Sequence, residues 1–216
     1  MDAGGQLSPE VLGRLARLNT PRYLEFKRDE IAALCDFHLA NPSPFPLVEI
    51  GSNRGRFAIG LAQGFAPERV LAIEWRRKWV RCLSDDIERL KLKNLVCLRA
   101  DARIALPIVA PARSVRRLFV LFPDPWWKRR HADRRLLDKP FLQTAAEFLE
   151  PGGLLIVKTD VPAIQRHLLD EVAGVDGLSL LPPEDCADEP QWTRSQRERG
   201  CVRDGIPIFR TFIIAD

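Results

Sequence analysis

The sequence predicts one α/β domain built on a largely parallel sheet. Apolar runs alternate with amphipathic stretches along most of the chain, which is typical of parallel strands joined by helices. A chain of 216 residues is long enough to bury a full core but short for two domains. The candidate strands are Leu47–Ile50, Val70–Ile73, Leu95–Leu98, Arg117–Phe122, Leu154–Lys158, Leu178–Leu181 and Pro207–Ile214.

Helical patterns fill most of the intervals between these strands. The candidate helices are Pro21–Leu39, Gly55–Gly64, Lys78–Leu90, Arg134–Leu149 and Ala163–Val172. Pro140 predicts a break or kink in the fourth of them, because proline removes an amide donor from a helix. Residues 1–20 look like a tail or a short helix capped by Ser8 before Pro9, and residues 21–216 like a single domain. The polar stretch Pro182–Gly205 lacks clear helical periodicity, and a connection of that length is usually functional or mobile.

Charge is concentrated in one part of the chain. The formal net charge is +4, and the segment from Asp124 to Lys139 holds six basic residues against three acidic ones. This excess is what an electrostatic contact with a polyanion requires. The alternative is that this run of charges is only the solvent-exposed face of a helix and binds no partner.

Cysteine usage and hydropathy favour the cytoplasm. The five cysteines are scattered and form no C-x-x-C pair, so they read as reduced thiols rather than disulfides or zinc ligands. The amino terminus has no charged start followed by an apolar core, and no apolar run reaches the length of a membrane span. His38 and His167 lack acidic partners at metal-ligand spacing, so no metal is expected.

The segment Leu121–Arg135, LFPDPWWKRRHADRR, differs from an ordinary strand-to-helix connection. Asp124 falls just past the carboxyl end of a buried strand, where open α/β sheets bind ligands. The prolines on both sides of it fix the backbone and give a stiff loop that aims the carboxylate. Trp126 or Trp127 offers a face for a base taken out of its stack, although packing against the sheet explains each tryptophan equally well.

A glycine-containing turn, VEIGSNRGRF, joins the first strand to a helix. It lacks the G-x-G-x-x-G spacing because Asn53 stands where the middle glycine would be, and such turns also occur without a ligand. Acidic residues near the ends of successive strands strengthen the case for a ligand, and they are Glu49, Glu74, Asp101 and Asp124. A carboxylate-lined pocket would repel the phosphates of a dinucleotide but suits hydroxyls, an amine and a sulfonium. S-adenosylmethionine therefore fits better than NAD.

The segments VEIGSNRGRF, AIE, ADA, FPDPWWKRRHADRR, PGGLLIVKTD and TRSQ…GIPIFR occur in this order. From about Leu47 to the carboxyl terminus the chain thereby resembles the bacterial tRNA (guanine-N7-)-methyltransferases. FPDPW followed by K-x-R-H-x-x-R-R is specific to that family, whereas the glycine turn is shared by many methyltransferases. The resemblance implies a Rossmann-like class I methyltransferase fold, with a mostly parallel seven-stranded sheet, an antiparallel C-terminal strand and helices on both faces. It also implies S-adenosylmethionine-dependent methylation of N7 of a guanine in the tRNA variable loop, at position forty-six.

The resemblance assigns expected roles to individual residues. The cofactor-binding residues would be Glu49, Gly51, Glu74, Asp101 and Asp124, with Asp124 also catalytic. The substrate-binding residues would be Lys128, Arg130, Arg134, Arg135, Asp160, Thr193, Arg194, Ser195 and Gln196. Three positions depart from the family pattern: Asn53 replaces a usual glycine, Asp133 interrupts the basic cluster, and Gln196 replaces the glutamate of a Thr-x-x-Glu segment.

Chemistry at guanine N7 agrees with these roles. N7 carries a lone pair and no proton, so methyl transfer needs no base at the attacking atom, and positioning supplies most of the rate. Asp124 can accept hydrogen bonds from the N1–H and amino groups of guanine. Asp160 can do similar work or offset the positive charge that develops on the purine.

Two alternatives remain at this stage. One is an RNA methyltransferase of the same architecture that acts on another site, which the glutamine at position 196 keeps open. The other is an RNA-binding module without turnover, which the carboxylates disfavour because they would face phosphates. The sequence does not decide between a monomer and a homodimer.

Overall fold

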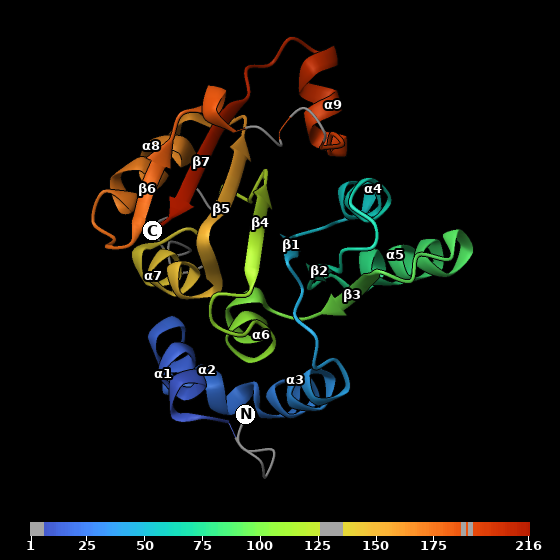
Figure 1. Cartoon of the computed structure of the whole chain (residues 1–216), viewed down its shortest axis with the longest axis vertical. Coiled ribbons are helices and arrows are strands. Elements are labelled where there is room, and N and C mark those ends of the chain that lie inside the picture. The colour runs from blue at the N-terminus through green and yellow to red at the C-terminus, as the bar shows by residue number, and fades with distance from the viewer. Residues whose placement is uncertain (1–6, 126–135, 187–188, 190–191) are drawn as a thin grey trace.

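The computed structural model of the protein describes residues 7–125, 136–186, 189 and 192–216. In chain order the elements are α1 (Pro9–Leu18), α2 (Pro21–Phe26), α3 (Arg28–Ala40), β1 (Leu47–Ile50), α4 (Arg56–Gly64), β2 (Val70–Glu74), α5 (Arg77–Leu90), β3 (Leu95–Arg99), α6 (Ala102–Val109), β4 (Val115–Leu121), α7 (Lys139–Phe148), β5 (Leu149–Thr159), α8 (Pro162–Val172), β6 (Leu178–Leu181), η2 (Pro183–Asp185), α9 (Gln196–Arg203) and β7 (Phe209–Ala215). Figure 1 shows the sheet running through the middle of the molecule, with α9 near the tips of β4 and β5.

The sheet has seven strands in the order β3-β2-β1-β4-β5-β7-β6. Strands β1 to β5 pair in parallel, and β7 is antiparallel to both of its neighbours. This confirms the predicted mixed sheet with an antiparallel last strand. The strand order reverses between β1 and β4, and the crevice at the carboxyl ends of such strands is where open α/β sheets bind ligands.

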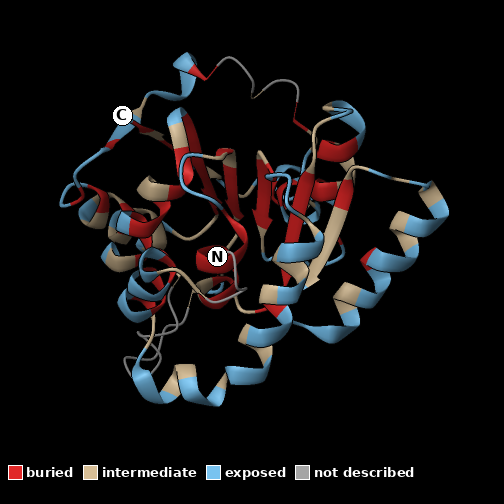
Figure 2. Ribbon diagram, turned by 60° about the horizontal axis from the view of Figure 1, so that its bottom comes forward, coloured by how far each residue is buried: buried red, intermediate tan, exposed pale blue. Residues whose placement is uncertain are grey.

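Successive strand residues point to opposite faces, so the sheet separates two cores. Leu118 belongs to a core formed with α1, α3, α6, α7 and α8, whereas the next residue, Phe119, packs with α4 and Leu83 of α5. Trp192 covers this second face and meets the Phe119 ring edge-on, with 5.1 Å between centroids. Helices on both faces are thus confirmed, and Figure 2 shows buried strands between helices whose outer sides are exposed.

The first described helix joins the first of these cores. Ser8 caps α1 by accepting a hydrogen bond from the amide of Val11, as the Ser-Pro signal indicated. Val11, Leu15 and Leu18 are buried against the α6 side of the sheet. Among the described residues no helix is long and apolar enough to cross a membrane.

Several helices differ from the sequence prediction. The predicted helix Pro21–Leu39 is two helices, because the backbone of Lys27 leaves the helical region between α2 and α3. Residues 134 and 135 of the predicted helix Arg134–Leu149 lie outside the described residues, and from residue 136 on the helix begins at Lys139, because Asp138 caps it. Pro140 then lies in the first turn, where proline needs no amide partner, so it causes no kink.

Two α-helices of the described residues were not predicted from the sequence. In α6 every residue except Arg103 is buried, so the helix has no polar stripe from which periodicity could be recognised. Helix α9 lies inside the polar stretch Pro182–Gly205, and the residues it buries are Glu198 and Cys201. A helix whose inward face carries a charged residue does not show the apolar spacing on which helix prediction rests.

Candidate active site

The turn between β1 and α4 forms through three residues with positive φ: Gly51, Asn53 and Gly55. Asn53 adopts the left-handed conformation, which asparagine tolerates better than most residues, so the turn closes without the glycine usual at this position. Gly55 has no substitute, because a Cβ atom there would lie 2.2 Å from Leu83 Cδ1. The turn therefore packs directly on α5.

Glu49 lies on β1 just before this turn and is buried. The backbone amide of Ala58, in the first turn of α4, hydrogen-bonds its carboxylate, while burial raises the pKa of Glu49 to about 8. Its Oε2 atom has no partner among the described residues. A buried acceptor without a donor is costly, so a ligand that donates to Glu49, or carries positive charge beside it, would be stabilised here.

Glu74 ends β2 and holds the same turn from the other side. Its Oε2 accepts the amide of Asn53 at 2.9 Å, and its Oε1 accepts the amide of Arg76 at 2.7 Å. A carboxylate has about four acceptor positions, so Glu74 keeps capacity for a further donor. The turn and the end of β2 are thus bound into one unit.

Asp101 follows β3 and caps α6 by accepting the amide of Arg103 at 2.9 Å. Its second oxygen accepts the hydroxyl of Tyr23 at 2.7 Å, and burial together with this carboxylate raises the pKa of Tyr23. The amide of Asp101 in turn donates to Glu30. The sequence analysis missed both partners, because Tyr23 and Glu30 lie before the segment that carries the family resemblance.

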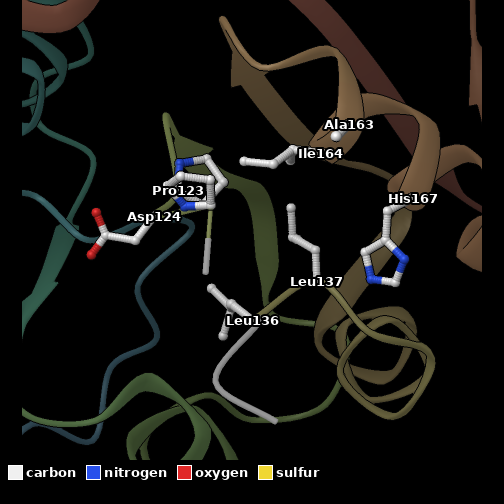
Figure 3. A pocket seen from close by; sticks show the side chains of 8 residues that line it. Pro123, Asp124, Leu136, Leu137, Ala163, Ile164 and His167 are labelled. Carbon is white, nitrogen blue, oxygen red and sulfur yellow. The ribbon is translucent and has the colours of Figure 1, made fainter. Parts of the chain in front are cut away.

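Asp124 is more than half exposed, and the Nη2 atom of Arg76 lies 3.3 Å from its Oδ2 atom. The carboxylate points away from the neighbouring apolar hollow between the loop and α8 (Figure 3). That hollow is lined by Pro123, Pro125, Leu136, Leu137, Ala163, Ile164 and His167 in addition to Asp124. Because the amide of Arg76 binds Glu74 and its side chain reaches Asp124, one residue connects the two carboxylates.

A buried charged group lies at the end of β5. Lys158 is 3% exposed, and its Nζ atom lies 3.0 Å from Glu198 and 3.2 Å from Glu189. Arg210 stands directly opposite Lys158 on β7 and reaches the same two glutamates. Like charges that face each other across strands repel, so the glutamates offset the two cations. Lys158 and Glu198 were not among the predicted site residues.

The predicted substrate segment 193–196 is attached to this group and to α4. Thr193 packs so tightly on Gly60 that a Cβ atom there would lie 2.2 Å from Thr193 Cγ2. Ser195 caps α9 by accepting the amide of Glu198 at 3.2 Å. Asp160 forms an ion pair with Arg197. Arg194 and Gln196 are exposed, whereas Glu198, in the first turn of α9, is a buried carboxylate.

The structure thus brings most of the predicted residues into two groups at the carboxyl ends of the strands, while Asp101 contacts Tyr23 and Arg103. Glu49, Gly51 and Glu74 surround the β1–α4 turn, and Asp124 is joined to them through Arg76. Asp160 and segment 193–196 are held by α9 and α4. Several predictions fall outside the described residues, namely those on Trp126, Trp127, Lys128, Arg130, Asp133, Arg134 and Arg135.

Solved structures of other proteins share this fold. The chain superimposes on TrmN from Thermus thermophilus with a TM-score of 0.55 and 22% identity, covering 86% of this chain and 48% of that one. A "putative methyltransferase" from Streptococcus mutans in complex with SAH gives a TM-score of 0.52 at 13% identity, covering 81% of this chain and 90% of that one. The fold is that of the Rossmann-like methyltransferases, as predicted.

Sequence comparisons define the family. The family described as "Putative methyltransferase" matches residues 44–211. The tRNA (guanine-N(7)-)-methyltransferase of Myxococcus xanthus is 31% identical over 208 residues, covering 94% of this chain and 98% of that protein. The enzyme of the same name from Anaeromyxobacter dehalogenans is 36% identical over 168 residues, covering 77% and 84%. The chain belongs to the tRNA (guanine-N7-)-methyltransferase family, an enzyme family whose methyl donor is S-adenosylmethionine.

Proposed function

We propose that the protein methylates N7 of a guanine in the variable loop of tRNA, at position 46, with S-adenosylmethionine as donor. The observation that carries the proposal is the buried Glu49, which has an oxygen without a partner beside a turn that Glu74 holds in place. Such a site favours a ligand with hydrogen-bond donors or positive charge. Family membership supplies the reaction in which that ligand takes part.

The carboxylates at the strand ends fit the cofactor group by group. Bound there, S-adenosylmethionine supplies an electrophilic methyl group on a sulfonium. Glu49 offers a charge partner for the cationic methionine end, because a neighbouring cation favours the ionised form of a buried acid. Glu74 has acceptor positions left for the ribose hydroxyls. Asp101, already oriented by Tyr23, can accept from the adenine amino group.

Asp124 is the residue that we assign to the guanine. Its exposed carboxylate lies just beyond β4, where it can accept from guanine N1–H and the amino group, and so hold N7 toward the methyl group. No proton leaves N7, so the protein contributes orientation rather than general-base catalysis. Because Arg76 Nη2 also contacts this carboxylate, binding of guanine must share or displace that contact.

Residues on the far side of the site complete the substrate contacts. Asp160 and segment 193–196, which α9 and Gly60 hold in place, would contact the target nucleotide. The glutamine at position 196 does not remove a buried charge, because its side chain is exposed. The buried carboxylate nearby is that of Glu198. Lys128, Arg130, Arg134 and Arg135 would bind phosphates, which position the RNA without reading its sequence.

A methyl-transfer assay tests the proposal. Purified protein is incubated with S-[methyl-³H]adenosylmethionine and unmodified tRNA transcripts, and the digested nucleosides are separated. We expect label in 7-methylguanosine for a transcript with guanosine at position 46 and none for its adenosine-46 counterpart. Asp124→Ala should abolish transfer, whereas Asp85→Ala, at an exposed residue of α5, should not. Label that persists in the adenosine transcript would indicate another target, and tRNA binding without any label would indicate a binding module.

A further inference from the structure

Four cations form an exposed surface beside the β1–α4 turn. Arg77, Lys78 and Arg81 lie on α5, and Arg54 lies in the turn itself; we call them the α5 cationic face. The three helix residues are spaced so that they share a side, opposite the buried Leu83. Neither residues 50–67 nor residues 75–84 include an aspartate or glutamate.

These cations form no ion pair with a carboxylate, whereas several other exposed arginines among the described residues do. Arg17, Arg89, Arg197 and Arg203 each contact a carboxylate. Within the described ranges, by contrast, none of the four residues of the α5 cationic face has an acidic side chain within ion-pair distance. The face therefore presents positive charge that the chain itself does not neutralise.

The position of this charge disfavours the helix that carries it. The first turn of α5 contains Arg77 and Lys78 but no acidic residue, and no side chain caps its amides. Cations at a helix amino terminus oppose the helix dipole. Cations at this position lower the stability of the helix, and a feature that lowers stability without a structural benefit is often a functional one.

Trp79 of α5 contacts cations from both the β1–α4 turn and α5 itself. The guanidinium of Arg54 lies 4.8 Å from the centre of the Trp79 ring, and the ammonium of Lys78 lies 4.9 Å from it. Cations held over an aromatic face lose less freedom when they bind an anion than cations on unconstrained side chains. Arg76, immediately before the helix, reaches Asp124, so the face adjoins the proposed methyl-transfer site.

We propose that the α5 cationic face binds backbone phosphates of the tRNA next to the target guanine. This inference rests on the proposed function, since it makes the face a second anchor of the same substrate. The basic cluster after Asp124 would be the first anchor. Two anchors on different elements would fix the orientation of the RNA across the site, which one cluster does not do alone.

The test compares two variants that remove the same charge from opposite ends of α5. Lys78→Gln with Arg81→Gln neutralises the face, and Lys91→Gln with Lys93→Gln is the control, because both lysines are exposed beyond the other end of the helix. Glutamine retains helix propensity. The affinity for unmodified tRNA is measured at several salt concentrations, together with the affinity for S-adenosylhomocysteine and the thermal midpoint.

We expect the face variant to bind tRNA about tenfold more weakly, with a salt slope lower by about two, one for each phosphate that the variant no longer binds. S-adenosylhomocysteine affinity should be unchanged, and the thermal midpoint should not fall, because the cations oppose the helix dipole. A face variant that binds tRNA as the control does would overturn the inference. Wild-type protein that makes no 7-methylguanosine would overturn the proposed function instead, so the two failures are distinguishable.

Discussion

Lys158 Nζ lies 3.0 Å from Glu198 Oε1, and both side chains are almost fully buried. The pair joins the end of β5 to α9, the helix that begins at Gln196. Next to it, Asp160 binds Arg197. Two adjacent ion pairs therefore connect the strand that carries Asp160 to the segment that carries the other predicted substrate residues.

Loss of one partner of this buried pair should be severe. We expect Lys158→Met to lower the free energy of unfolding by about 3–5 kcal/mol, because it removes the ammonium group 3.0 Å from the buried Glu198 carboxylate and leaves that carboxylate only Arg210, at 3.9 Å. Restoring neutrality with Glu198→Gln in the same chain should recover part of that loss. Urea unfolding of both variants measures this. The exposed pair Arg203–Asp204 is the control, since Asp204→Asn should have little effect on stability. Equal losses in Lys158→Met and Asp204→Asn would contradict the assignment.

The contact between Gly60 and Thr193 gives a second prediction. Alanine usually stabilises a helix relative to glycine by about 0.5–1 kcal/mol. Gly60→Ala should instead destabilise the protein and raise the KM for tRNA, because its Cβ would meet Thr193 at 2.2 Å and displace the substrate segment. Gly64→Ala, at the end of the same helix with nothing within 4 Å of its Cβ, should be neutral or stabilising. Thermal unfolding and steady-state kinetics measure both effects in the two variants. The same thermal midpoint and the same KM for tRNA in Gly60→Ala and Gly64→Ala would contradict the importance of this contact.

Sequence patterns predicted the parts of this protein that depend on local order. Apolar runs located the strands, and acidic residues near their ends located Glu49 and Glu74, because parallel strands bring their carboxyl ends to one edge. What they missed depends on distant partners. From the sequence, Lys158 is the last residue of a predicted strand and Glu198 a charged residue of a polar connection. The two residues are 40 positions apart, and a buried ion pair between such distant residues produces no local sequence pattern.

Tyr23 and Asp101 give a third prediction, on a contact that no motif indicated. Tyr23→Phe keeps the ring and its stacking with Phe26 but removes the hydroxyl that donates to Asp101 at 2.7 Å. We expect a loss of about 1 kcal/mol in stability and S-adenosylhomocysteine binding that is weaker by about threefold to tenfold, because the carboxylate loses its fixed orientation. Calorimetric titration of wild type and variant tests this. Unchanged affinity would show that Tyr23 serves folding alone.

The raised pKa of Glu49 gives the last prediction, a pH dependence. Burial raises this pKa from 4.5 to about 8, so between those values the folded protein holds a proton that the unfolded chain has released. The stability that Glu49 contributes is then complete below about pH 4.5 and is lost as the pH rises through about 8. We expect wild type to lose stability relative to Glu49→Gln across this window, by an amount on the order of several kcal/mol.

Binding should show the opposite trend. A cationic ligand beside Glu49 favours its ionised form, so the affinity of wild type for S-adenosylmethionine should increase from pH 6 to pH 8, with release of a proton on binding. Calorimetric titrations in buffers of different ionisation enthalpy detect that proton. Glu49→Gln removes the titrating group and should show neither the pH dependence nor the release. If wild type and Glu49→Gln gave the same pH profile for both unfolding and binding, then Glu49 would lie outside the cofactor site.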